Sequence, residues 1–129
     1  MNRHQGGSWF RKFSNAFRGI GISLVSQSSF WVHVPVSVGV GVLGWWLGVS
    51  VFEGFVLGLC VGLVMIAEML NTAIEYLAKE ITDEFSENVR DGLDVASGAV
   101  LLSAVVAATI GAWILVTRVW AVVSGYPAA

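Results

Sequence analysis

The chain has 129 residues, of which 56% are hydrophobic and only 12% are charged, and its formal net charge is −2. Soluble domains usually carry about 25% charged residues. This composition therefore excludes a disordered tail and a basic nucleic-acid-binding protein, and it argues against a water-soluble globule. The single cysteine, Cys60, excludes a disulfide within the chain and a multi-cysteine metal site. The length is that of one small domain.

Residues 8–25 are expected to form an amphipathic helix. Aromatic and aliphatic residues recur there mostly at steps of three and four, and basic residues fall mostly on the other side. Such a helix lies in the membrane interface, with Arg11, Lys12 and Arg18 near lipid headgroups; a simple anchor is the alternative. No A-x-A-like cleavage site follows the long basic region. We therefore expect residues 1–29, a cytoplasmic tail plus this surface helix, to belong to the mature protein.

Three long stretches of the chain contain no Asp, Glu, Lys or Arg. They are residues 19–52, 54–67 and 95–117. A helix that crosses a hydrocarbon core of about 30 Å needs roughly 20 apolar residues. Three transmembrane helices are therefore predicted, at Phe30–Leu47, Val51–Lys79 and Gly92–Val119. The fold class predicted is an all-α membrane protein, with the membrane domain over residues 30–119.

The distribution of Lys and Arg predicts the orientation. Basic residues precede the first predicted span and flank the loop 80–91, whereas the link between the first two spans has none. By the positive-inside rule, the N-terminus and this loop are cytoplasmic and the C-terminal tail, residues 120–129, is outside.

Small residues repeat along the predicted spans. Gly54, Gly58 and Gly62 lie on one face of the second span. Close packing of small residues is a common way for helices to associate in lipid. Three helices leave much of this small-residue surface unpaired, so a homo-oligomer is expected.

A set of polar residues occupies one face near the end of the second span. Glu68, Asn71, Thr72 and Glu75 follow at steps that place them on one helix face. Glu68 lies about 26 Å along the helix from Val51, close to the cytoplasmic edge of the hydrocarbon. An ionisable group there is a functional candidate by default.

The residue types of this face suggest chemistry. A carboxylate in apolar surroundings suits proton abstraction, and one at the wet end suits Mg²⁺. The amide of Asn71 can bind a phosphate oxygen or a metal. A polar seam that merely pairs helices is the alternative.

Two further residues could belong to the same region. Asp94 lies at the start of the third predicted span and is placed to face Glu75. An acid near a helix N-terminus is equally explained by the helix dipole. His33, near the start of the first span, is interpreted as a hydrogen-bonded interface residue and not as a metal ligand.

Two motifs resemble a known family. The segment E-M-L-N-T-A-I-E at 68–75 and the segment D-V-A-S-G-A-V-L-L at 94–102 resemble the small prokaryotic integral-membrane diacylglycerol and undecaprenol kinases. F-R-G-I at 17–20 and F-W-V-H at 30–33 are weaker matches. The resemblance implies an ATP-dependent lipid kinase of the bacterial inner membrane. It implies a homotrimer whose subunits each have three transmembrane helices and an amphipathic surface helix.

The resemblance also implies roles for single residues. Glu68 matches the general base for the lipid hydroxyl, and Glu75 matches a Mg²⁺ ligand. Asn71 and Asp94 match positions near the nucleotide phosphates, and Glu84 matches an acidic position near the nucleotide. The surface helix and His33 would contact lipid.

The sequence departs from the family pattern at several positions. Many members carry a metal-binding Glu where this chain has Gln27, and a Lys-Asp pair where it has Leu93-Asp94. Arg90, one turn earlier, is a candidate substitute for the missing phosphate-binding Lys. These departures leave open a catalytically impaired member that binds lipid or scaffolds partners. A proton-relay or transport protein is a third hypothesis. The choice between diacylglycerol and undecaprenol also stays open.

Overall fold

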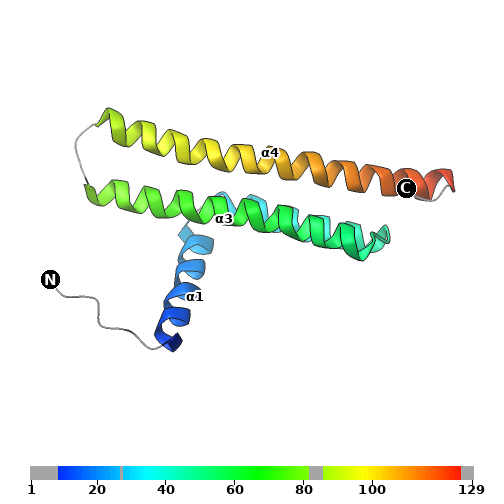
Figure 1. The fold of residues 1–129 in the computed structure, drawn as a ribbon, viewed down its shortest axis with the longest axis horizontal. Helices are drawn as coiled ribbons and strands as arrows, with labels where there is room; N and C mark the ends of the chain where they lie inside the picture. The colour runs from blue at the N-terminus through cyan, green and yellow to red at the C-terminus, as the bar shows by residue number, and fades with distance from the viewer. Residues whose placement is uncertain (1–8, 27, 82–85, 126–129) are drawn as a thin grey trace.

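The computed structural model describes residues 9–26, 28–81 and 86–125, and in this part of the chain helices are the only regular elements. Its helices are α1 (Trp9–Ser26), α2 (Phe30–Trp46), α3 (Val51–Ile81) and α4 (Glu87–Ser124), as Figure 1 shows. The predicted all-α fold class is confirmed. Residues Gln27 and Glu84, predicted to contact metal and nucleotide, lie outside the described residues.

The long helices α3 and α4 run antiparallel and lie side by side (Figure 1). They have 31 and 38 residues, and both are long and apolar enough to cross a membrane. At about 1.5 Å per residue, each is longer than the roughly 30 Å hydrocarbon core. The polar ends of this hairpin therefore extend beyond the apolar zone of a membrane.

The start of α4 differs from the prediction. The helix begins at Glu87 after the extended residue Ser86, and not at Gly92. Glu87 supplies the acid of the first turn, which suits the helix dipole. Asp94 consequently lies about two turns inside the helix, where the terminal dipole effect has faded. The interpretation of Asp94 as an acid at a helix N-terminus was therefore wrong.

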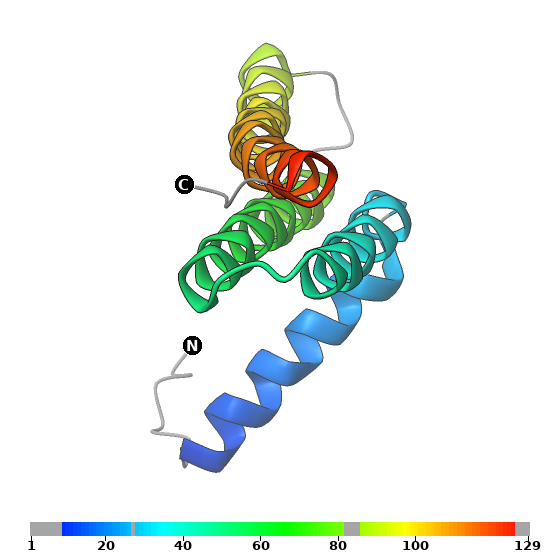
Figure 2. The ribbon, with the colours of Figure 1, turned by 90° about the vertical axis from the view of Figure 1, so that its right-hand side faces the viewer.

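Helices α2 and α1 complete the described structure. Figure 2 shows α2 packed with α3 and α4 as a three-helix bundle, while α1 leaves the bundle. The axes of α1 and α2 differ by 102°, and α2, with 17 residues, qualifies as a third span only together with α1. The helix at α1 is confirmed. Its place in the membrane interface and the third span stay predictions.

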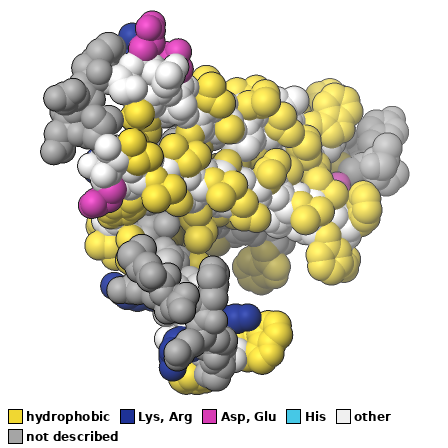
Figure 3. All heavy atoms as spheres, turned by 60° about the vertical axis from the view of Figure 1, so that its left-hand side comes forward, with side chains coloured by type: hydrophobic (Ala, Val, Ile, Leu, Met, Phe, Trp, Pro, Cys, Tyr) yellow, Lys and Arg dark blue, Asp and Glu magenta, His cyan; other side chains and the backbone are white. Residues whose placement is uncertain are grey.

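Most large apolar side chains face outward. Among the described residues, six hydrophobic ones are buried: Phe30, Leu47, Leu57, Val64, Ala96 and Ile114. Figure 3 shows apolar side chains over much of the helical surface, with acidic side chains near the end where α3 stops and α4 starts. An apolar surface of this kind is suited to contact with lipid.

The two ends of the bundle contain different segments of the chain. The link end holds the turn between α2 and α3 (residues 47–50) and the last turns of α4. The site end holds the start of α2, the last turns of α3 and the start of α4. Gly48 has a φ of 67° at the link end, a left-handed conformation that favours glycine.

A carboxylate organises the link end. The backbone N–H of Ser50 donates to Glu53 Oε2 at 2.6 Å, and that of Glu53 donates to Ser50 Oγ at 3.2 Å. This reciprocal pair is a capping box at the start of α3. Arg118 of α4 donates from Nε to Glu53 Oε1 at 2.9 Å and also pairs with Oε2. The link end is therefore closed by a bidentate ion pair between α3 and α4.

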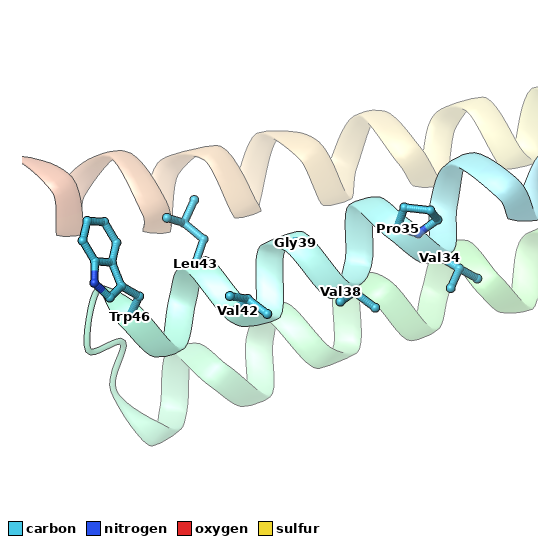
Figure 4. A pocket seen from close by; sticks show the side chains of 7 residues that line it. All are labelled: Val34, Pro35, Val38, Gly39, Val42, Leu43 and Trp46. Atoms are coloured by element: carbon cyan, nitrogen blue, oxygen red, sulfur yellow. The ribbon is translucent and has the colours of Figure 1, made fainter.

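Two apolar hollows follow the bundle. The first is an open hollow on α2, lined by side chains from Val34 to Trp46 without any ionisable group (Figure 4). The second, of about 460 Å³, lies between α2, α3 and α4 and is called the groove below. Its lining is apolar apart from His33, Ser37 and Cys60.

Candidate active site

The predicted polar face of α3 is formed, and most of it is buried. Glu68 is 3% exposed, Asn71 8% and Thr72 2%, while Glu75 is half-buried. The hydroxyl of Thr72 donates to the carbonyl oxygen of Glu68 at 2.8 Å. Burying a carboxylate is costly unless it has hydrogen-bond partners, so Glu68 needs a donor.

The donor to Glu68 comes from α2. Nε2 of His33 lies 3.0 Å from Oε1 of Glu68, with the two side chains 25% and 4% exposed. The hydroxyl of Ser37 donates to the carbonyl oxygen of His33 at 2.7 Å. His33 was predicted to be a hydrogen-bonded interface residue in contact with lipid, and its contact with Glu68 was not predicted. Because both residues lie a similar number of positions from the link 47–50, the antiparallel register of α2 and α3 could have paired them.

Asn71 joins the second carboxylate of the face. Its Nδ2 donates to Oε1 of Glu75 at 2.7 Å. Its Oδ1 is buried and has no hydrogen-bond partner in the described structure. Buried polar atoms are almost always satisfied, so an unpartnered acceptor here indicates a missing ligand or water. A cation or an N–H donor would satisfy it.

The oxygen atoms of Asn71 and Glu75 suit a hard cation. Mg²⁺ is usually held by one or two carboxylates together with waters and substrate phosphates, and not by a complete protein cage. The described residues contain no group of three or more His, Cys, Asp or Glu that could hold a metal by themselves. The donor set therefore fits a Mg²⁺ ion that shares its coordination with a bound phosphate.

The predicted nucleotide residues on α4 are less organised. Asp94 is exposed and makes no hydrogen bond or ion pair with any residue in the described ranges. Arg90 is exposed and donates to Asp91 Oδ1 at 3.0 and 3.3 Å, with Glu87 3.5 Å away. Exposed ion pairs of this kind are weak and exchange readily. No contact between Asp94 and Glu75 is present in this part of the structure.

The predicted lipid-facing cations lie on α1. Arg11, Lys12 and Arg18 are all exposed, and Nζ of Lys12 sits 4.9 Å from the ring centre of Trp9. They lie on a helix that leaves the bundle (Figure 2). Their prediction as headgroup contacts stays a prediction.

The groove ends beside the buried carboxylate. Leu57 and Leu115 line it towards the link end, whereas His33 lines it at the site end. Because His33 also bonds Glu68, the groove leads along the bundle to the His33–Glu68 pair. An apolar chain in the groove would bring a polar head to this pair.

Comparisons with known proteins agree with these features. The family model of prokaryotic diacylglycerol kinase matches residues 14–115. The chain is 30% identical over 117 residues to the undecaprenol kinase of Bacillus subtilis, covering 91% of this chain and 95% of that protein. It is 33% identical over 104 residues to the diacylglycerol kinase of Synechocystis sp., covering 80% and 59% of the two.

The diacylglycerol kinase of Escherichia coli K12 is 30% identical over 92 residues, covering 71% of this chain and 75% of that protein. No solved structure matches the chain.

Proposed function

The chain belongs to the prokaryotic diacylglycerol kinase family and is a lipid kinase, and we propose that it phosphorylates the hydroxyl of diacylglycerol or undecaprenol with Mg-ATP at the cytoplasmic face of the bacterial inner membrane. The observation that carries the proposal is the buried Glu68. It bonds His33, which lines the site end of an apolar groove, and it lies on the same helix face as Asn71 and Glu75.

Glu68 is the base in this proposal. The hydroxyl O–H bond of the lipid breaks, its proton passes to the Glu68 carboxylate, and the oxygen forms the new bond to the γ-phosphorus of ATP. ADP leaves with the electrons of the broken P–O bond. Phosphoryl transfer depends mainly on positioning and on charge neutralisation. The protein therefore needs a well-placed carboxylate and a bound phosphate donor whose charge is neutralised.

Asn71 and Glu75 would hold the metal, which when bound neutralises charge on the phosphates. The unpartnered Oδ1 of Asn71 supports this assignment. Asp94, Glu84 and Gln27 keep their proposed roles at the nucleotide and metal. Arg90 pairs with Glu87 and Asp91 at an exposed position, and exposed ion pairs exchange readily, so a phosphate can compete for its guanidinium.

The lipid chain is proposed to lie in the groove. Its lining is apolar, it runs along the bundle, and it ends at His33 beside Glu68. Because lipid arrives from the bilayer and ATP from water, the membrane interface is where both can reach one carboxylate. Arg11, Lys12 and Arg18 on α1 would sit near the headgroups there.

A homotrimer is proposed as the working form. A side chain added at Gly54, Gly58 or Gly62 would meet nothing within 4 Å, so this glycine face of α3 is open within one chain. Close helix packing in lipid uses such faces. Chemical crosslinking in membranes should give trimers for the native chain and lose them for Gly58→Leu. Unchanged trimers in that variant would place the interface elsewhere.

The proposed function is tested by phosphate transfer in detergent micelles. Purified protein is given labelled Mg-ATP with diacylglycerol and with undecaprenol in parallel, and Glu68→Ala is the control. Product on one lipid that disappears in Glu68→Ala supports the proposal and identifies the acceptor. A folded protein that labels neither lipid would instead favour an impaired, lipid-binding member of the family, with Gln27 and Leu93 as the suspected causes.

A further inference from the structure

The contact between His33 and Glu68 has a consequence for catalysis. We propose that His33 is a positioning residue for phosphoryl transfer: its Nε2–H holds the buried Glu68 carboxylate in one orientation at the site end of the groove. This inference rests on the proposed function of Glu68 as the base. The pair joins α2 to α3 across 35 residues of sequence.

The donor and acceptor of the pair follow from the proposed role of Glu68. An ionised carboxylate only accepts hydrogen bonds, so a Glu68 that acts as the base accepts the 3.0 Å contact from an Nε2–H of His33. Glu68 is 3% exposed, so water cannot replace this donor freely. Removing the imidazole would leave a buried acceptor without its partner, and the carboxylate would lose the contact that holds its orientation.

The backbone around the pair is held on both helices. Ser37 bonds the carbonyl oxygen of His33, and Thr72 bonds that of Glu68. What the backbone does not determine is the position of the carboxylate, because a Glu side chain has three rotatable torsions. The His33 contact supplies that restraint. A base displaced by about 1 Å can lose roughly 10²-fold in rate.

The groove shows why the position matters. His33 lines the groove and also bonds Glu68, so the groove adjoins the base through His33. A lipid hydroxyl reaching the end of the groove would therefore find a carboxylate whose accessible edge is set by His33. Loss of the contact should lower kcat more than it raises KM for ATP.

Two substitutions of His33 separate positioning from other roles. His33→Leu removes the donor and retains apolar bulk, whereas His33→Gln retains an N–H donor of similar reach. Thr109→Val, at an exposed polar position on α4 that does not line the groove, is the control. Each full-length variant is purified, checked for the native oligomer by size exclusion, and assayed for kcat and for KM of lipid and ATP.

We expect kcat to fall by about 10²-fold in His33→Leu with KM for ATP unchanged. His33→Gln should return to within about tenfold of the native rate, and Thr109→Val should match the native protein. Native kcat in His33→Leu overturns the proposal. So does a folded His33→Gln that is as inactive as His33→Leu, because a retained donor would then be insufficient.

A spectroscopic measurement separates failure of this inference from failure of the proposed function. Solid-state ¹⁵N NMR of the full-length protein in bilayers reports the tautomer of His33, with His33→Gln used for assignment. The Nε2–H form that changes in Glu68→Ala supports the contact even if neither lipid is phosphorylated. An Nδ1–H form that is insensitive to Glu68→Ala overturns the inference even in an active kinase.

Discussion

The two ends of α3 each carry a carboxylate that contacts another helix, and they differ in how completely it is satisfied. At the link end, both oxygens of Glu53 accept from Arg118, and Ser50 adds a backbone donor. At the site end, Glu68 is held by His33, and Oδ1 of Asn71 nearby has no partner in the described structure. A saturated carboxylate can only stabilise the fold. A carboxylate held by one titratable ring, beside an unpartnered acceptor, remains available for chemistry.

The largest expected effect is a loss of catalytic rate at the site end. Glu68→Gln keeps the size of the side chain but removes the base, and we expect kcat to fall by about 10³-fold. Glu53→Gln is the matched substitution at the link end and should retain the native kcat per folded protein. The lipid phosphorylation assay measures both. Equal losses in the two variants would contradict the division between the ends.

The next effect concerns the metal. Glu75→Gln keeps the amide contact to Asn71 possible but removes the negative charge, so we expect the Mg²⁺ concentration needed for half-maximal activity to rise by roughly 10-fold or more. A titration of activity with Mg²⁺ at saturating ATP measures it. Glu80→Gln, an exposed acid on the same helix, is the control. An unchanged Mg²⁺ requirement would remove Glu75 from the metal site.

The smallest effect is on stability at the link end. Arg118→Leu leaves the Glu53 carboxylate without its cation, and we expect the Tm in detergent to fall by roughly 5 °C while kcat per folded protein stays native. The double variant Glu53→Leu with Arg118→Leu should recover part of the loss, because no unpaired charge remains. A double variant with a lower Tm than Arg118→Leu would contradict the unpaired Glu53 charge as the cause of the loss.

The local parts of the structure could be predicted from the sequence. Long uncharged runs predicted the apolar helices, and the 3.6-residue period placed Glu68, Asn71 and Glu75 on one face. The start of α4 was misplaced because the uncharged run, and not the cap at Ser86, was used to locate it. Charged residues form helices as readily as apolar ones, so absence of charge marks a membrane zone and not a helix end.

The contacts between distant residues could not be predicted in the same way. His33 meets Glu68 across 35 positions, and Glu53 meets Arg118 across 65. His33 already had a sufficient local interpretation as an interface histidine, and no local pattern pointed from Glu53 to Arg118. The pattern S-V-F-E at 50–53 carries the capping-box signal and could have marked Glu53 as structural.

By itself, the sequence determined the apolar helices, the polar face on α3 and the resemblance to a family of lipid kinases. Only the tertiary structure decided which carboxylate is closed by an arginine and which is held by a histidine at the end of a groove. Helix formation, and the helix face on which a side chain lies, depend on residues three or four positions apart. The pairing of charges depends on the register between helices, and that register is set by packing over the whole bundle.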